Sequence, residues 1–333
     1  MIPHTGIVQS GLKMKRRFWP WLILSGVGAT VIGGLYGAYV RDMRAIAHRL
    51  STESRLIQTS HGPVEFAVRG EGPPVMVVHG AGGGYDQGTL IADTFGGNGF
   101  RWIAPSRFGY LRTPLPEDAS TRAQADSFAG LLDALGIERI GILAISGGVP
   151  PSLQFAAHYP ARVSSLVLLS SAPYTPLKAD EKARPIPAWA YQMLFSSDFP
   201  YWLLQRLARR RLEALFDVAP ALRETLTPED RTLVSRLIDA FQPVTQRVDG
   251  LRNEAAAIDP RAHYALDRIT APTLVIHARD DGMNPFSVGE HLAAHVTNAR
   301  FMPLKSGGHP LLGHQVEVRE NVSAFLRKFS GTR

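Results

Sequence analysis

From Arg55 onward, short apolar segments alternate with segments of helical length, an arrangement that few folds accommodate. Apolar runs of this length are typical of buried strands, and a strand–helix alternation is typical of a mostly parallel sheet. The pattern therefore predicts an α/β fold with helices on both faces of the sheet. We expect eight strands near residues 56–58, 64–68, 75–79, 102–104, 140–145, 165–169, 273–277 and 301–304. Helices are expected near residues 85–95, 121–135, 150–158, 285–296 and 316–328.

The alternation is interrupted between the sixth and seventh expected strands. Residues 174–268 carry too many aromatic and aliphatic side chains for a solvent-exposed loop, so we expect them to form helices that pack over the domain. Open α/β sheets bind their ligands at the carboxyl edge, and a helical cap is expected there. The aromatic side chains either hold this cap together or line a substrate pocket. The core is then formed by residues 55–173 and 269–333.

Residues 1–54 form a separate N-terminal segment. Its residues 18–40 contain no charged side chain and are long enough to span a bilayer as a helix. Four basic residues between Lys13 and Arg17 precede this stretch, which favours a cytoplasmic N-terminus with the rest of the chain on the non-cytoplasmic side. A signal peptide has the same pattern, so secretion after cleavage is the alternative. We expect a membrane anchor followed by a short helical stalk at residues 42–52.

The composition excludes several classes of protein. The chain has 333 residues and no cysteine, so a disulfide framework, a thiolate metal site and a cysteine nucleophile are all impossible. The net charge is +7, but the basic residues are dispersed and show no aromatic–basic pattern of a nucleic-acid surface. His291 and His295 are spaced four apart but have no third ligand nearby. We therefore expect no nucleic-acid partner, no metal and no cofactor.

The strand expected at residues 140–145 stops at Ser146, which lies between small residues. A serine on a sharp strand-to-helix turn has a crowded backbone, so the residues two positions away must be small, as Ala144 and Gly148 are. Such a turn exposes the hydroxyl and places Gly147 N–H beside it, where it can stabilise an oxyanion. The alternative is a plain strand–helix junction with an incidental serine.

A nucleophilic serine requires a second oxyanion donor, a base, and an acid that orients the base. The loop at residues 80–84, which follows the third expected strand, is rich in glycine. Its Ala81 N–H is the first candidate for the second donor, and Gly82 N–H is the next. As a nucleotide-binding loop it fails, because no Gly-Lys-Ser/Thr follows it.

Candidates for the acid and the base follow the last two expected strands. Asp280 and Asp281 come after the seventh strand, and either carboxylate can orient a histidine. His309 lies in a glycine loop after the eighth strand. A serine, an aspartate and a histidine thus appear in this order, each just past the carboxyl end of a strand.

Together, these motifs resemble the α/β-hydrolase family, in the branch with a serine nucleophile and a cap after the sixth strand. The resemblance covers residues 55–328 and implies the same eight-stranded sheet. In that family the acid is the fourth residue of a small-x-x-Asp turn, which implies Asp281 and leaves Asp280 as a solvated neighbour. The resemblance also implies that His79 structures its loop. Ser106 stands where the family often has an aspartate, in a turn that is usually structural.

The resemblance implies a serine hydrolase in which Ser146, Asp281 and His309 form a catalytic triad. The N–H groups of Ala81 and Gly147 then form the oxyanion hole. The expected substrate is a small carboxylic ester or related acyl compound of apolar character. Lactone and carbon–carbon bond hydrolysis use the same triad, and a non-catalytic ligand-binding protein of this fold is an alternative of another class. The sequence leaves the oligomeric state open.

Overall fold

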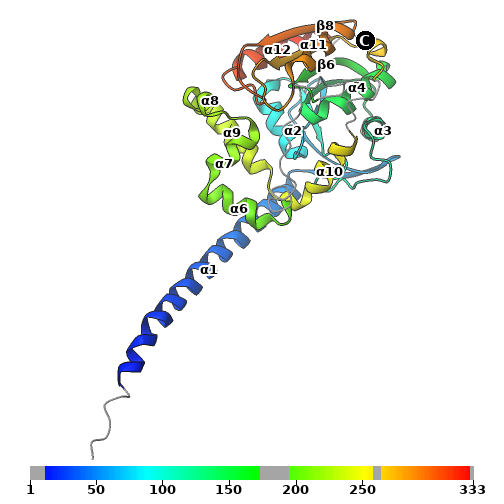
Figure 1. The fold of residues 1–333 in the computed structure, drawn as a ribbon. Helices are drawn as coiled ribbons and strands as arrows, with labels where there is room; N and C mark the ends of the chain where they lie inside the picture. Colours follow the sequence, from blue (N-terminus) through cyan, green and yellow to red (C-terminus); the bar gives the residue numbers. More distant parts are fainter. Residues whose placement is uncertain (1–11, 173–194, 258–263, 331–333) are drawn as a thin grey trace, which may run out of the picture. The chain divides into compact units, whose positions relative to one another are not determined.

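The computed structural model describes residues 12–172, 195–257 and 264–330. The chain divides into two compact units, residues 1–49 and 50–333, and each is described by itself. The described part of the first unit is helical and belongs to α1 (Leu12–Thr52), whose last three residues are assigned to the second unit (Figure 1). Among the described residues, no helix is both long and apolar enough to cross a membrane, so the anchor expected at residues 18–40 finds no support in the structure.

The second unit is built on one sheet of eight strands (Figure 1). The strands are β1 (Arg55–Thr59), β2 (Gly62–Arg69), β3 (Pro74–Val78), β4 (Arg101–Pro105), β5 (Ile140–Ile145), β6 (Val163–Leu169), β7 (Thr273–Ala278) and β8 (Ala299–Leu304). Their order across the sheet is β1-β2-β4-β3-β5-β6-β7-β8. The β1–β2 and β2–β4 pairs are antiparallel, and all the other pairs are parallel. The predicted eight-stranded, mostly parallel sheet is therefore confirmed.

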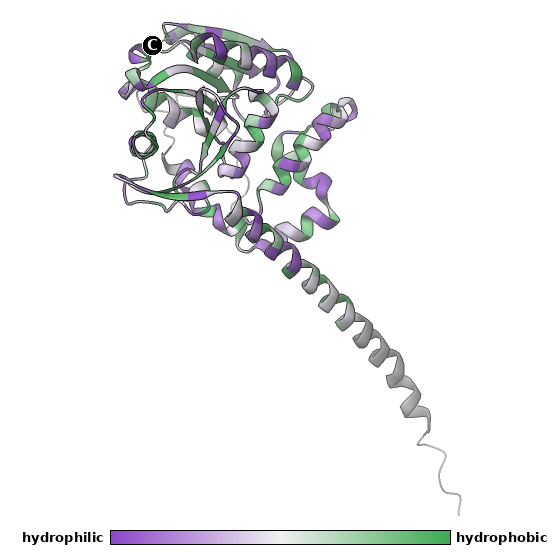
Figure 2. Ribbon diagram, turned by 180° about the vertical axis from the view of Figure 1, so that it is seen from behind, coloured by the Kyte–Doolittle hydropathy of each residue, from purple (hydrophilic) through white to green (hydrophobic). Residues whose placement is uncertain are grey.

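Helices cover both faces of this sheet. They are α2 (Tyr85–Ile91) with a π-helical continuation at Ala92–Gly96, α3 (Thr121–Ala134), α4 (Val149–His158), α11 (Phe286–His295) and α12 (Gln315–Ser330). Successive side chains of a strand point to opposite faces, and the two faces belong to separate hydrophobic clusters. On β3, Met76 and Val78 pack with α3, α4 and α11, whereas Val75 and Val77 pack with α2 and α12. Figure 2 shows both hydrophobic and hydrophilic residues on these helices, as expected of elements with one buried side.

The insert between β6 and β7 is helical in its described part. Its helices are α6 (Asp198–Leu207), α7 (Arg209–Glu213), α8 (Pro220–Thr225), α9 (Pro228–Ala240) and α10 (Val248–Ala257). Tyr201, Leu212 and Ile238 belong to the same hydrophobic cluster as α2 and α12, so these cap helices pack on the core through apolar side chains. Residues 173–194, which include part of the predicted cap, lie outside the described residues.

Candidate active site

Ser146 lies at the turn that joins β5 to α4. Its φ of +53° is in the left-handed region, which costs a non-glycine residue free energy and marks a constrained turn. The turn is so tight that a Cβ on Gly148 would lie 2.5 Å from Val78 O and 2.6 Å from His79 O. A Cβ on Gly80 would lie 3.1 Å from Ser146 Cβ. The structure thus forms the strained serine turn that the small flanking residues predict.

The structure brings Asp281 and His309 together. Asp281 follows β7 and His309 follows β8, and these strands are parallel neighbours, so both residues emerge at one edge of the sheet. His309 Nδ1 donates to Asp281 Oδ2 at 2.9 Å and lies 3.2 Å from Oδ1. The side chain of Asp281 is completely buried, and that of His309 is 12% exposed. An imidazole held by a buried carboxylate in this way is suited to act as a base.

The Asp281 carboxylate is fully paired. Its Oδ1 accepts the backbone N–H groups of Met283 at 2.9 Å and Asn284 at 2.8 Å. Its Oδ2 also lies 3.2 Å from Nε2 of the buried His277. Burial alone would raise the pKa of Asp281, but the charge of His309 and the hydrogen bonds that the carboxylate accepts hold it well below its usual range. These contacts favour the ionised form of Asp281, which is the form that can hold the imidazole.

His309 responds in the opposite direction. Burial alone would lower its pKa, but the charge and hydrogen bond of Asp281, together with the charge of Asp217, raise the pKa above the ordinary histidine value. The imidazolium form is thus stabilised, which suits a group that must take up a proton during catalysis.

Ser146 Oγ and His309 line the same cavity. In the part of the chain that the structure describes, the hydroxyl has one hydrogen-bond partner, Asn284 Nδ2 at 3.5 Å, and none on His309. Asn284 Nδ2 also donates to Ser170 O at 2.8 Å, so the amide bridges the turns that follow β5 and β6. Catalytic hydrogen bonds of unliganded enzymes often form fully only with substrate.

The loop at residues 80–84 lies against the serine turn. Gly80 N–H donates to Gln87 Oε1 at 2.9 Å and Gly82 N–H donates to Tyr110 Oη at 3.3 Å. Among the described residues, Ala81 N–H has no hydrogen-bond partner, and Ala81 lines the cavity with Ser146. Of the two candidate donors in this loop, Ala81 is therefore the one available to an oxyanion.

The side chain of His79, which contacts Arg107, holds the start of this loop in place. His79 Nε2 accepts Arg107 N–H at 3.0 Å, which places the ring proton on Nδ1, and Nδ1 donates to Gly80 O at 2.8 Å. Burial and the adjacent Arg107 hold the pKa of His79 well below its usual value, so the ring is neutral. His79 has the contacts expected of a loop-structuring residue. Both of its ring nitrogens are hydrogen-bonded to backbone groups, so neither is available to act as a base.

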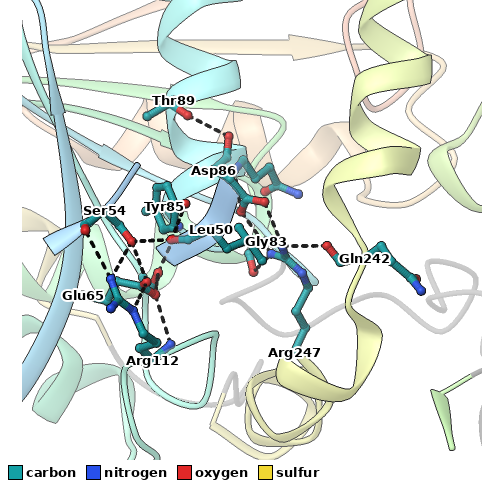
Figure 3. A network of polar contacts seen from close by, with 12 residues as sticks. Leu50, Ser54, Glu65, Gly83, Tyr85, Asp86, Thr89, Arg112, Gln242 and Arg247 are labelled. Carbon is teal, nitrogen blue, oxygen red and sulfur yellow. Dashed lines mark hydrogen bonds and ion pairs between the residues drawn. The ribbon is translucent and has the colours of Figure 1, made fainter. Parts of the chain in front are cut away.

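A cap residue holds the far end of the same loop. The completely buried Arg247, which precedes α10, donates to Gly83 O at 2.6 Å and to both oxygens of Asp86 at 3.1 and 2.8 Å (Figure 3). Asp86 lies in the first turn of α2, directly after the loop. The buried charges are thus paired and hydrogen-bonded, which is the condition for keeping them out of water.

Ser106 belongs to a second buried network beside α2. Its hydroxyl accepts Tyr85 N–H at 3.0 Å and donates to Glu65 Oε2 at 3.0 Å. Glu65 is buried and pairs with Arg112, whose Nε lies 2.7 Å from Oε1 (Figure 3). Ser106 stands where the family often has an aspartate, and here the carboxylate of Glu65 on β2 lies beside the turn instead. These contacts orient the start of α2 and touch neither Ser146 nor His309.

The cavity over Ser146 has a volume of about 250 Å³. Its described lining is mostly apolar and comes from both the core and the cap, and the cap contributes Phe195, Leu215, Phe216, Leu233, Leu237 and Phe241 among others. No Lys, Arg, Asp or Glu lines it within the described residues. A cavity of this size and polarity fits an apolar group of a small substrate.

Comparisons with known proteins identify the family of the chain. The alpha/beta hydrolase fold family matches residues 73–313. The chain belongs to this family. The solved structure of an alpha/beta hydrolase fold protein from Nakamurella multipartita has a TM-score of 0.73 and 28% sequence identity, and the match covers 84% of this chain and 100% of that one.

Two curated relatives of this alpha/beta hydrolase also share 28% sequence identity with it. The uncharacterized hydrolase YcgS of Bacillus subtilis is 28% identical, over 74% of this chain and 88% of its own length. The 2-hydroxymuconate semialdehyde hydrolase of Pseudomonas putida is 28% identical, over 78% of this chain and 88% of its own length. Similarity over most of both chains supports hydrolase activity.

The structure adds contacts of Asp280 and two further residues to the description of the site of this hydrolase. Asp280 is exposed, as expected of a solvated neighbour, and its carboxylate also accepts Gly307 N–H at 3.2 Å and Gly308 N–H at 2.9 Å. Asn284, in contact with Ser146, and Asp217, in contact with the histidine loop, have no motif that marks them in the sequence. Among the described residues, no group of three or more His, Asp or Glu side chains is arranged so that it could hold a metal ion.

Proposed function

We propose that this alpha/beta hydrolase is a serine hydrolase that cleaves a carboxylic ester with an apolar acyl group through an acyl-enzyme. The observation that carries the proposal is the cavity, in which Ser146 and His309 lie beneath an apolar lining free of charged side chains in its described part. The His309–Asp281 hydrogen bond supports the role of the histidine as base.

The proposed reaction begins when Ser146 Oγ attacks the ester carbonyl carbon and passes its proton to His309 Nε2. Asp281 stabilises the resulting imidazolium. The carbonyl oxygen becomes an oxyanion that accepts Ala81 N–H and Gly147 N–H, and loss of one such donor typically costs roughly 3 to 4 kcal/mol of transition-state stabilisation.

The tetrahedral intermediate then expels the alcohol, which takes the proton back from His309. This leaves the acyl group on Ser146 Oγ. Water attacks the acyl carbonyl while His309 accepts a proton from that water, and collapse of the second intermediate releases the carboxylic acid and restores the serine. Acylation and deacylation each begin with a neutral imidazole that accepts a proton, and each ends when the imidazolium gives that proton up, to the alcohol in the first case and to Ser146 Oγ in the second.

Hydrolysis of a carbon–carbon bond is the second candidate, and the similarity to the 2-hydroxymuconate semialdehyde hydrolase favours it. The compound in that name is a carboxylate, and a buried carboxylate needs a cationic or strongly hydrogen-bonding partner. The described cavity lining offers no Lys or Arg. For this reason we place the neutral ester first.

Two assays separate the candidates. The first is hydrolysis of p-nitrophenyl esters of increasing acyl length by the wild-type protein and by Ser146→Ala, and the second is cleavage of 2-hydroxymuconate semialdehyde under the same conditions. We expect ester turnover that is lost in Ser146→Ala and slow or absent cleavage of the semialdehyde. The reverse preference would make carbon–carbon hydrolysis the function.

Labelling with a fluorophosphonate tests for catalysis independently of the substrate. We expect labelling of Ser146 in the wild-type protein and its loss in His309→Ala. A folded wild-type protein that takes up no label and turns over neither substrate would be a non-catalytic binding protein of this fold.

A further inference from the structure

A turn of the cap reaches the loops that carry the proposed acid and base. Asp217 follows the short 3₁₀ turn Ala214–Phe216 and precedes α8, and its φ of +60° is in the left-handed region. A non-glycine residue in this conformation is constrained by its surroundings. The surroundings here are the loops after β7 and β8.

One carboxylate oxygen of Asp217 joins these two loops. Oδ2 accepts Gly282 N–H at 2.8 Å and His309 N–H at 2.9 Å. Gly282 directly follows Asp281, so the oxygen is hydrogen-bonded to the backbone of the proposed base and to that of the residue next to the acid. Hydrogen bonds from N–H to an ionised carboxylate are stronger than those between neutral groups.

Two glycines, Gly282 directly after Asp281 and Gly308 directly before His309, leave room for the Asp217 carboxylate. A Cβ on Gly308 would lie 3.0 Å from both the backbone oxygen and Oδ2 of Asp217, closer than most real Cβ contacts. A Cβ on Gly282 would clash with Oδ1 of the same side chain. The Asp217 carboxylate thus sits against the backbone of both loops.

The same turn also reaches the substrate cavity. Leu215 and Phe216, the two residues before Asp217, line the cavity that contains Ser146. An acyl group in the cavity would therefore touch the turn whose next residue binds the backbone of His309.

We propose that Asp217 is a positioning residue of the cap, which fixes the His309 imidazole against Asp281 and couples its alignment to occupancy of the acyl cavity. This inference rests on the proposed function, because it assigns Asp217 a role in the proposed reaction. The negative charge of Asp217 also stabilises the imidazolium form of His309. The charges of Asp281 and Asp217 both raise the pKa of that imidazole.

The test compares Asp217→Asn and Asp217→Ala with the wild-type full-length protein, using the pH dependence of kcat/KM for a p-nitrophenyl ester. Asp217→Asn keeps an oxygen that accepts the two N–H groups but loses the charge, so we expect the acid-side inflection to move down by about half a pH unit or more. Asp217→Ala also removes the acceptor, and we expect kcat to fall by about tenfold to a hundredfold because the base is misplaced. Asp249→Asn is the control, since this carboxylate is 65% exposed and pairs with Arg252.

The outcomes distinguish a positioning role from a structural one. A loss of kcat in Asp217→Asn without any shift of the inflection, or wild-type values in both variants, would overturn the inference. If Asp217→Ala fails to fold, which a thermal melt reveals, Asp217→Asn and Asp217→Glu decide the question. A wild-type protein without ester turnover or fluorophosphonate labelling would instead contradict the proposed function.

Discussion

Asp281 Oδ2 lies 2.9 Å from His309 Nδ1, and the carboxylate is completely buried while the imidazole reaches the cavity. This pair determines the pH dependence of the proposed reaction. The pKa of His309 is raised, so the ring is protonated below that pKa and unable to accept the serine proton. The pKa of Asp281 is lowered, so the carboxylate does not titrate in the working range.

We therefore expect kcat/KM to rise with pH through a single inflection above the ordinary histidine value of about 6.5. The measurement is ester hydrolysis between pH 5 and pH 9, roughly the range in which a histidine titrates. Thermal melts across the same range exclude unfolding as the cause of a loss at low pH. A flat profile in a folded enzyme would remove His309 from the base role.

Asp281→Asn tests which carboxylate orients the base. An amide removes the charge that stabilises the imidazolium and permits the wrong tautomer, so we expect kcat to fall on the order of 10³- to 10⁴-fold. We also expect the remaining activity to show its inflection at lower pH, because the charge that raises the pKa of His309 is gone. The matched control is Asp280→Asn, whose carboxylate accepts two loop N–H groups but does not contact the imidazole. A larger loss in the control would assign the acid to Asp280.

Gly148→Ala tests the steric requirement of the serine turn. The added Cβ would lie 2.5 Å and 2.6 Å from two backbone oxygens, closer than real Cβ contacts allow, so the turn must shift. We expect a loss of about 1 to 3 kcal/mol in the free energy of unfolding, typical of overpacking, and at least a tenfold lower kcat. Urea denaturation and ester turnover provide the two measurements.

The control for this substitution is Gly33→Ala in α1, where nothing lies within 4 Å of the added Cβ. It should leave ester turnover unchanged. Wild-type kcat and stability in Gly148→Ala would mean that the turn tolerates a larger residue than its geometry indicates.

The sheet and the order of the candidate residues could be predicted because they are encoded locally. Buried strands such as β5 are continuous apolar runs, and their hydrophobicity identifies them without any knowledge of their neighbours. Ser146, Asp281 and His309 each follow such a strand directly. Parallel strands bring these ends to one edge, so strand position alone predicted that Asp281 and His309 meet.

The cap contribution could not be predicted in the same way. Asp217 is 92 residues from His309, and its carboxylate accepts the backbone N–H of that residue, a donor that every residue except proline has. Aspartate adopts the left-handed conformation seen at Asp217 only occasionally, so the residue type alone does not predict this turn. Asn284 reaches Ser146 across 138 residues, again without a local pattern. Such contacts depend on how the cap and loops pack, which a single sequence does not encode locally.

Phe241 lines the cavity over Ser146 and gives a test of whether the acyl group binds there. Its ring lies 5.8 Å from that of Tyr201 and 5.6 Å from that of Phe216, and it occupies the space that a side chain on Gly82 would need. Phe241→Ala should lengthen the cavity, because the partly buried ring is at the centre of this aromatic cluster. We expect the preferred acyl chain to become longer by several carbons.

The size of this effect follows from the burial of methylene groups. Each additional buried CH₂ contributes about 0.8 kcal/mol, so the ratio of kcat/KM values for long and short p-nitrophenyl esters should rise about fourfold per accommodated carbon. Using the ratio cancels any general loss of activity caused by movement of the adjacent loop. Phe325→Ala is the control, since Phe325 on α12 is also partly buried but does not line the cavity. It should lower the melting temperature without changing the ratio, and an unchanged ratio in Phe241→Ala would place the acyl group outside this cavity.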